Sequence, residues 1–349
     1  MSLDRIGGVA IAAALTFIGA CAEPLPPLRY ETEQAVVGTD FGDPLCGYDL
    51  PWIDKQIEFV EGMLDAESSD KIEIYLYGDA PEFCGHEAIS GCYNPERDIV
   101  VSAWWVVDHE IVHAVVDRFA DSRPFWDEGI AEALRLHRPT RRGWVPIETN
   151  AMARDGVEVE YLGAGHFTRW LIENHGITAL KRVLRGTSTD EAFGASLETL
   201  AAAYEAQAPD AYPSWAPCDY PPLMSSGPEH WEEEVEVTCE RSDVTRFSER
   251  KRTLLRSVEL AGGRYTFEVR GTDTWGQFLG CLTEPRYEPV GSMMHGDTMS
   301  ELEHSLTAPG IRFEAGVVHT IELTAGLYKL AIPVEEDGER VEVSLARIE

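Results

Sequence analysis

Residues 103–119 read AWWVVDHEIVHAVVDRF, and this stretch decides the fold of the region around it. Apolar side chains cover most of the circumference of a helix with this sequence, which is typical of a buried helix in the middle of a domain. Three polar side chains, His109, Glu110 and His113, interrupt the apolar surface near its centre. Because burying such groups without partners costs free energy, the sequence predicts that something in the core satisfies them.

The three polar residues have the spacing of a metal site. His109 and His113 are four residues apart and project from the same helical face, so both imidazoles can reach one divalent ion, while Glu110 beside them can handle a proton. A tetrahedral catalytic zinc also needs a third protein ligand and an open position. Glu128, within WDEGIAE at 126–132, is our candidate. The polar, proline-containing stretch before it allows a second helix to run back beside the first.

This arrangement, H-E-x-x-H followed by E-G-x-A-E, resembles the gluzincin metallopeptidases, and in particular their thermolysin-like and M1-aminopeptidase-like branches. The resemblance covers about residues 50–206 and implies a zincin-like domain, a small sheet with several helices, that binds Zn²⁺. A second acidic residue one turn after the third ligand matches the position that orients a ligand histidine. The resemblance makes His109, His113 and Glu128 the zinc ligands, Glu110 the general base and Glu132 the orienting residue.

The resemblance continues in YLGAGHFTRWL at 161–171. In M1-like enzymes a tyrosine opens such a helix and donates a hydrogen bond to the tetrahedral intermediate. Tyr161 is therefore the candidate for this role, and His166 is the alternative. The sequence lacks the G-x-M-E-N segment that grips the free amine of the substrate in those aminopeptidases, so an endopeptidase is favoured over an aminopeptidase.

The expected activity is zinc-dependent hydrolysis of peptide bonds in a peptide or protein substrate, with Glu110 accepting a proton from the metal-activated water. The alternative is a catalytically inactive zincin-like surface lipoprotein that binds protein or glycan through its C-terminal domain. Retention of Glu110 favours the enzyme, because an inactive descendant has little reason to keep a general base.

The first residues predict export. Arg5 precedes an uncharged, largely apolar run from Ile6 to Ile18, and small residues follow just before Cys21. This resembles a bacterial lipoprotein signal, which implies cleavage before Cys21, lipidation of that cysteine, and anchoring of the protein to a membrane of the cell envelope, at the outer membrane or in the periplasm. The alternative is an ordinary secretory peptide cut near Ala20 or Ala22.

The cysteines support an oxidising compartment. Six of the seven follow Cys21, and an even number suits disulfide bonds in an exported protein. No C-x-x-C pair is present, so a thiolate zinc site has no support. The pairings expected are Cys84 with Cys92 first, because they bracket a short loop, then Cys239 with Cys281, and by elimination Cys46 with Cys218.

The periodicity of the chain predicts an α+β protein: a zincin-like domain followed by an all-β sandwich. Helical spacing is expected at 51–66, 103–119, 126–137, 161–175, 177–185 and 190–206. Strand patterns are expected at 71–78 and 99–101 and, later in the chain, at 264–270, 317–323, 327–332 and 341–346. The expected division is a signal peptide at 1–20, a tether at 21–45, the zincin-like domain at 46–208, a proline-rich connector at 209–230 and the sandwich at 231–349.

The charge of the chain excludes one class of partner. Sixty-one acidic residues face 29 basic ones, for a formal net charge of −32. Nucleic-acid binding needs a basic stripe that displaces counterions from phosphates, and the sequence contains none. We therefore expect no nucleic-acid partner.

Overall fold

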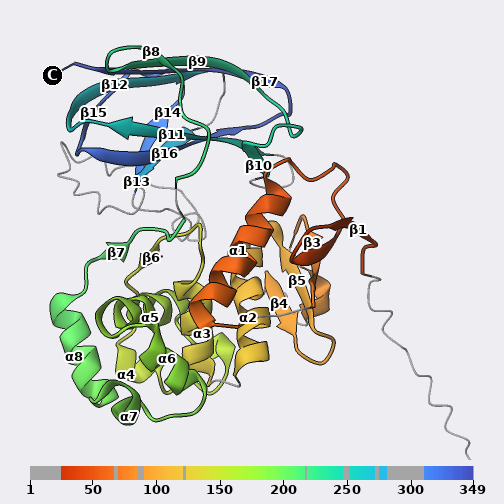
Figure 1. Cartoon of the computed structure of the whole chain (residues 1–349), viewed down its shortest axis with the longest axis vertical. Helices are drawn as coiled ribbons and strands as arrows, with labels where there is room; N and C mark the ends of the chain where they lie inside the picture. Colours follow the sequence, from red (N-terminus) through yellow and green to blue (C-terminus); the bar gives the residue numbers. More distant parts are fainter. Residues whose placement is uncertain are drawn as a thin grey trace, which may run out of the picture.

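The computed structural model describes residues 25–66, 70–79, 81–84, 90–120, 123–216, 218–246, 251–271, 275–280 and 310–348. Within these ranges the chain is a mixed α+β protein, as the sequence predicts. Helices and a five-stranded sheet form the N-terminal part, and two further five-stranded sheets form the C-terminal part (Figure 1). The expected signal peptide with Cys21 lies outside the described residues.

The N-terminal sheet has the strand order β1-β2-β3-β5-β4. Its inner pairs β2/β3 and β3/β5 are parallel, whereas β1/β2 and β4/β5 are antiparallel. Among the described strands β4 pairs only with β5, so it is an edge strand. The strands are β1 (Leu28–Glu31), β2 (Ala35–Thr39), β3 (Ile72–Tyr77), β4 (Gly91–Asn94) and β5 (Ile99–Ala103).

The first two strands correct the expectation of a tether at 21–45. Ala35 and Val37 are fully buried in β2, where they join the core between the sheet and the helices. The proline, glycine and glutamate content around them suggested an unfolded spacer. The short apolar run Ala35-Val36-Val37 supplies enough buried surface to add a strand to the sheet instead.

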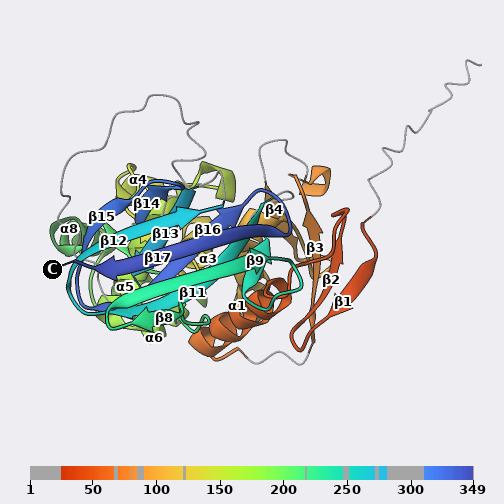
Figure 2. The same ribbon diagram turned by 90° about the horizontal axis from the view of Figure 1, so that it is seen from above.

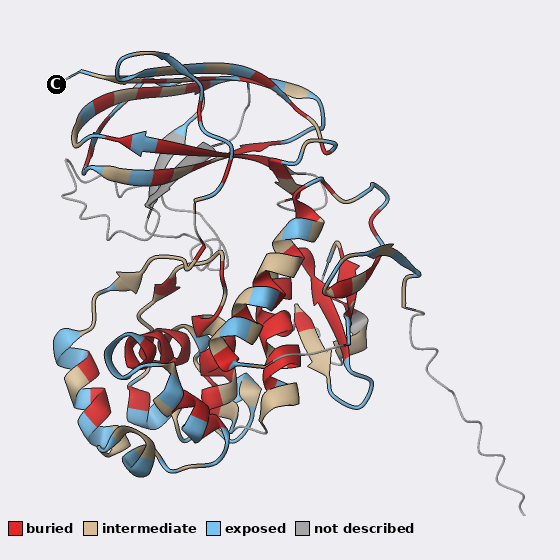
Figure 3. Cartoon of the chain, viewed as in Figure 1, coloured by how far each residue is buried: buried red, intermediate tan, exposed pale blue. Residues whose placement is uncertain are grey.

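Two helices cover one face of this sheet, and one of them carries the H-E-x-x-H motif. They are α1 (Asp49–Leu64) and α2 (Val107–Phe119), which follows a short 3-10 turn, η2 (Trp104–Val106). Alternate residues of β3 and β5 point to the helices and to the opposite face, as expected for strands covered on both sides. α2 is buried along almost its whole length, which agrees with its apolar circumference (Figure 3).

The remaining helices complete this part of the molecule. α5 coincides with the expected range 161–175, but the expected helix at 190–206 is divided at Gly194, whose positive φ of 74° ends α7. These elements are α3 (Pro124–Ala133), α4 (Ile147–Asn150), η3 (Gly156–Glu158), α5 (Tyr161–His175), α6 (Ile177–Leu184), α7 (Thr189–Phe193) and α8 (Leu197–Gln207), with a two-stranded pair β6 (Thr140–Arg141) and β7 (Ala211–Tyr212).

The C-terminal part consists of two antiparallel sheets, with the orders β10-β11-β16-β13-β14 and β15-β12-β17-β9-β8. Residues of both sheets share one apolar core, and the two sheets lie one above the other at the top of Figure 1. The strands are β8 (Ser225–Gly227), β9 (His230–Val237), β10 (Val244–Arg246), β11 (Arg252–Leu260), β12 (Gly263–Arg270), β13 (Trp275–Gly280), β14 (Gly310–Glu314), β15 (His319–Leu323), β16 (Gly326–Val334) and β17 (Glu339–Arg347).

The start of α1 lies against the C-terminal part, beside β10 (Figure 1). Figure 2 shows the molecule from above, with the C-terminal sheets in front of the helices. The carboxylate of Asp49 accepts hydrogen bonds from the backbone N–H of Cys46 at 2.7 Å, the backbone N–H of Arg246 at 2.8 Å and the hydroxyl of Thr245 at 2.8 Å. The indole N–H of Trp104 donates to the carbonyl of Arg246. Because Trp104 lies in η2, the end of β10 contacts both α1 and the entry to α2.

The disulfides differ in part from the pairings expected. Cys84 is bonded to Cys92, as the sequence predicts. Cys46, however, is bonded to Cys239, so the pairings Cys239 with Cys281 and Cys46 with Cys218 are wrong. The reason is the junction at α1, where the N–H of Gly47 donates to the carbonyl of Cys239 at 2.7 Å and holds the two segments together. Cys218 is also disulfide-bonded, and Cys281 lies outside the described residues.

The disulfide bonds Cys46–Cys239 and Cys84–Cys92 indicate an extracellular or otherwise oxidising compartment. A search of the described residues finds no helix with the length and apolar character required to cross a membrane.

Candidate metal centre

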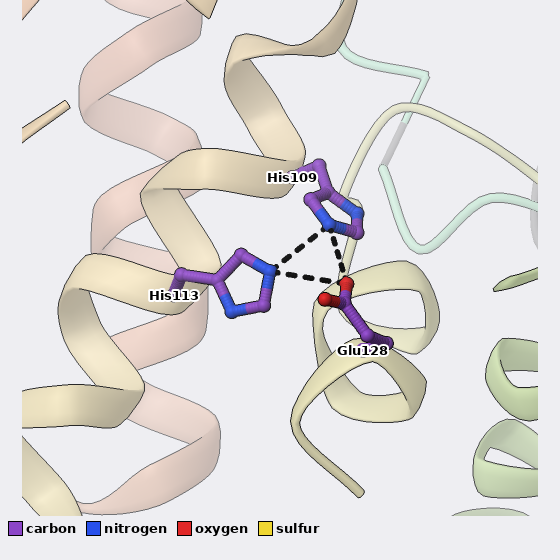
Figure 4. A group of neighbouring side chains, drawn as sticks. All are labelled: His109, His113 and Glu128. Carbon is purple, nitrogen blue, oxygen red and sulfur yellow. Dashed lines mark hydrogen bonds and ion pairs between the residues drawn. The ribbon is translucent and has the colours of Figure 1, made fainter. Parts of the chain in front are cut away.

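His109 and His113 of α2 point toward Glu128 of α3 (Figure 4). One turn of α2 separates the two histidines, so their side chains lie one above the other on the face that α3 covers. The structure thus brings together the three residues for which the sequence predicts a metal-binding role. All three are buried or half-buried.

Two glycines let α3 pack closely against α5. A methyl group at Gly129 would lie 2.5 Å from Oγ1 of Thr168, and one at Gly165 would lie 2.4 Å from Cβ of Glu132. Both contacts are too short for any larger residue without a shift of the helices. The glycine within the E-G-x-A-E sequence therefore sets how α3 lies on α5, and with it the position of Glu128.

The three ligand atoms form a nearly equilateral triangle. Nε2 of His109 lies 3.0 Å from Nε2 of His113 and 3.1 Å from Oε2 of Glu128, and the third side, between His113 and Glu128, is 3.3 Å. Ligands bonded at 2.0–2.1 Å to a tetrahedral zinc ion are about 3.3 Å apart. The cluster therefore fits a metal ion of this size with little movement of its side chains.

In the absence of a metal the cluster favours bound protons. Burial lowers the pKa of His109, but hydrogen bonds with Glu128 and Glu132 outweigh this effect and raise the pKa to about 9. The pKa of His113 is likewise raised, by Asp127 and Glu128, against the effect of burial. Burial raises the pKa of Glu128, yet the two histidines lower it to about 2. A cation at the centre of the triangle would replace these protons.

A series of buried charged side chains contacts His109 on the side of its ring that faces away from the triangle. Oε1 of Glu132 lies 2.9 Å from Nδ1 of His109 and accepts a hydrogen bond from Nη1 of Arg135 at 3.0 Å. Arg135 also donates to Oδ1 of the fully buried Asp108 at 2.8 Å, and Arg138 lies 3.3 Å from Oδ2 of Asp108. On the second histidine, Oδ2 of Asp127 lies 3.4 Å from Nδ1 of His113. These contacts fix both rings with Nε2 facing the triangle.

Glu110 is buried beside the ligands and next to the edge strand β4. A methyl group at Gly91, the first residue of β4, would lie 2.9 Å from Cγ and 3.0 Å from Oε1 of Glu110. Burial raises the pKa of Glu110, while His109 and His113 oppose this effect. A carboxylate with a raised pKa is a better proton acceptor near neutral pH than an exposed one, so its environment suits a general base.

Tyr161 lies at the site, as the sequence predicts for a candidate catalytic residue. Its ring stacks on the imidazole of His109, with the ring centres 5.6 Å apart and the planes at 17°. The residue is 39% exposed, so part of it is accessible to a ligand. Burial, together with nearby carboxylates led by Glu128, raises the pKa of the phenol, which keeps it protonated and able to donate.

His166 lies in a different environment. It is fully buried, its Nδ1 lies 2.9 Å from the hydroxyl of Tyr204, and its ring centre lies 5.0 Å from that of Tyr212. Burial, with Arg142 and Arg169 nearby, lowers its pKa to about 3. Five residues on a helix correspond to a rotation of about 140°, so His166 and Tyr161 project from different faces of α5. The structure therefore gives His166 no contact with the triangle.

No sequence motif identifies several of the residues that build the site. Arg135 lies just past the end of α3, three residues after Glu132, a spacing that permits an ion pair, but its contact with Asp108 depends on how this part of the chain packs on α2. Gly156 is the other example. A methyl group there would lie 2.3 Å from Oε1 of Glu128, so η3 closes over the third ligand. Comparison with known families and with curated proteins finds no match to the chain.

Proposed function

We propose that this chain is an exported zinc metallopeptidase of gluzincin type. The observation that carries the proposal is the triangle of His109, His113 and Glu128, with Glu110 buried beside it. Two nitrogens and one carboxylate oxygen form a donor set typical of catalytic zinc, and three protein ligands leave a fourth position for substrate or water. The resemblance to thermolysin-like and M1-like sequences supports the same assignment.

The residues around the triangle divide the work of hydrolysis. When bound, zinc supplies Lewis-acid chemistry that polarises a carbonyl group and makes a water molecule more acidic. Glu110 would accept the proton of the attacking water and deliver it to the leaving amine. The hydroxyl of Tyr161 would donate a hydrogen bond to the substrate oxygen as negative charge develops on it. Glu132 and Asp127 would hold the ligand imidazoles in the orientation that presents Nε2.

The edge strand β4 supports a polypeptide as the substrate. Gly91 of β4 contacts Glu110, so a chain that paired with the open edge of β4 would pass close to the general base. Such a chain need not present its end at the site, which agrees with an endopeptidase. We interpret the two C-terminal sheets as a β-sandwich for targeting or substrate presentation, and Cys21 as the site of a lipid anchor. Replacing Cys21 with Ser should release an anchored protein from the membrane fraction.

The decisive experiment is the substitution Glu110→Gln. We expect the variant to bind zinc with the stoichiometry of the wild type and to lose at least about 10²-fold in peptide hydrolysis, since a general base contributes 10²–10⁴-fold. Glu58→Gln, on the exposed side of α1, is the matched control and should retain full activity. Full activity of Glu110→Gln would refute the assigned base. Zinc binding by the wild type without cleavage of any member of a peptide library would favour the binding lipoprotein.

A further inference from the structure

Exposed apolar side chains gather in one segment of the chain. Among the residues that the structure describes, the three most exposed large apolar side chains are Trp144 at 78%, Met152 at 77% and Val157 at 70%, ahead of Met224 at 62%. All three belong to the segment 144–161. Exposed apolar residues are usually scattered, and a group of them in one segment marks a surface that binds something.

This segment borders the metal centre at two points. Gly156, the residue before Val157, lies against the carboxylate of Glu128. Tyr161, at the end of the segment, stacks on His109. The segment that carries the exposed apolar side chains therefore contacts two of the three proposed ligands.

The segment is also held in place. The side-chain amide of Asn150 donates to the carbonyl of Glu160, and its oxygen accepts the N–H of Glu160, both at 2.8 Å. The carboxylate of Glu160 caps α5 by accepting the N–H of Gly163 at 2.9 Å, and it lies so close to Gly143 that no side chain fits there. Trp144 directly follows Gly143. The exposed side chains thus project from a backbone whose position is fixed before a ligand arrives, which lowers the entropy cost of binding.

We propose that Trp144, Met152 and Val157 form a substrate-binding wall that receives an apolar side chain of a polypeptide near the bond to be cleaved. The inference rests on the proposed peptidase function and adds a substrate class to it. The segment from 144 to 161 contains four acidic residues and one basic residue. Peptides that combine an apolar residue with neutral or basic neighbours are therefore favoured, and acidic peptides are disfavoured. The same charge opposes docking on an anionic membrane.

The test compares the triple variant Trp144→Ser/Met152→Ser/Val157→Ser with the double variant Met224→Ser/Val318→Ser. The control removes apolar side chains that are 62% and 59% exposed in the C-terminal part. Both variants should keep the zinc content and Tm of the wild type, because all the substituted side chains are exposed. A peptide library that varies the residues around one cleavable bond then reports selectivity. A second readout measures binding of the preferred peptide to Glu110→Gln, with and without the triple substitution.

We expect the wild type and the control to prefer an apolar residue at one position by about tenfold or more, and the triple variant to lose that preference in kcat/KM and in peptide binding. Peptides without an apolar residue should be cleaved equally by all three. An unchanged preference in the triple variant, with cleavage intact, would overturn this inference and leave the proposed function standing. If the wild type cleaves no peptide and Glu110→Gln binds none, both the inference and the proposed function are overturned. Binding of uncharged phosphatidylcholine vesicles that the triple substitution abolishes, with peptide selectivity unchanged, would assign the surface to lipid and overturn the inference.

Discussion

Oε1 of Glu132 lies 2.9 Å from Nδ1 of His109 and 3.0 Å from Nη1 of Arg135. The carboxylate therefore joins a proposed metal ligand to a buried cation. When the His109 ring is neutral, donation from Nδ1 to Glu132 leaves the lone pair of Nε2 facing His113 and Glu128. The side chains behind the triangle thus set the tautomer and direction of a ligand, and they belong to the metal centre as much as the ligands do.

Arg135→Met is expected to weaken zinc binding by about 10–100-fold, because Glu132 loses the partner that holds it against His109. The same change should lower the free energy of unfolding by about 3–5 kcal/mol, since Asp108 stays buried without Arg135. Adding Asp108→Asn should restore part of the stability but not the zinc affinity. Chelator competition and denaturant unfolding measure the two effects. Arg182→Met, which removes an exposed ion pair with Glu191, is the control. Unchanged zinc affinity in Arg135→Met would contradict the supporting role.

Zinc affinity should rise with pH up to about 9. The metal-free protein holds a proton on His109, whose pKa is raised to about 9, and the metal must displace it. Each proton released adds one unit to the slope of log affinity against pH below that value. Calorimetry in buffers of different ionisation enthalpy would count the protons. The stability of the metal-free protein should change with pH in the opposite direction to the zinc affinity. The stabilising contribution of charged His109 is complete below pH 6.5 and is lost as the pH rises through about 9. A pH-independent zinc affinity between 6 and 9 would contradict this prediction.

Gly129→Ala should destabilise the protein by about 1–3 kcal/mol, because the new methyl group would lie 2.5 Å from Oγ1 of Thr168 and force α3 away from α5. Zinc affinity should fall with it, since α3 carries Glu128. Gly62→Ala in α1 is the matched control: a methyl group there meets no atom within 4 Å. That change should be neutral or stabilise by up to about 1 kcal/mol through helix propensity. Thermal unfolding of both variants separates the effect of contact from the effect of helix propensity.

Tyr161→Phe should lower kcat without changing the Tm, whereas His166→Gln should lower the Tm with little change in kcat. Removal of the Tyr161 hydroxyl should lower kcat by about 10²-fold or more with zinc content and Tm unchanged, because its ring stacks on His109 and its proposed role is to donate to the substrate oxygen. His166→Gln should leave kcat within a few-fold of the wild type and lower the Tm, because His166 is buried on Tyr204. Kinetics and unfolding on the same samples distinguish the two residues. Loss of kcat in His166→Gln at an unchanged Tm would show that His166 acts in catalysis.

The residues that converge on the metal centre could be predicted where the relevant geometry is local. His109 and His113 share a helical face because they are four residues apart, and the turn before α3 makes the approach of Glu128 plausible. The partners Asp108 and Arg135 could not be predicted in the same way. Their contact depends on the packing of α2 against α3, which no spacing within either helix specifies.

The errors elsewhere have similar causes. The bond between Cys46 and Cys239 joins residues 193 positions apart across two parts of the fold, and nothing in the local sequence of either cysteine indicates its partner. The sequence pattern did not predict strand β2, because its buried run is only a few residues long and lies in a polar, proline-containing stretch. Burial against α1 and α2, not local preference, makes Ala35 and Val37 part of the sheet.

The bond between Cys46 and Cys239 closes a covalent ring around the entire metal centre. Every residue from α1 to β9, including all the proposed ligands and the apolar segment at 144–161, lies inside that ring. A proteolytic nick at any one exposed loop within it would open the chain without releasing a fragment, since both pieces would stay joined at the junction beside α1. Fragments held in this way can keep their packing and even their metal. A protein that is exposed to proteases would thereby survive a single cut.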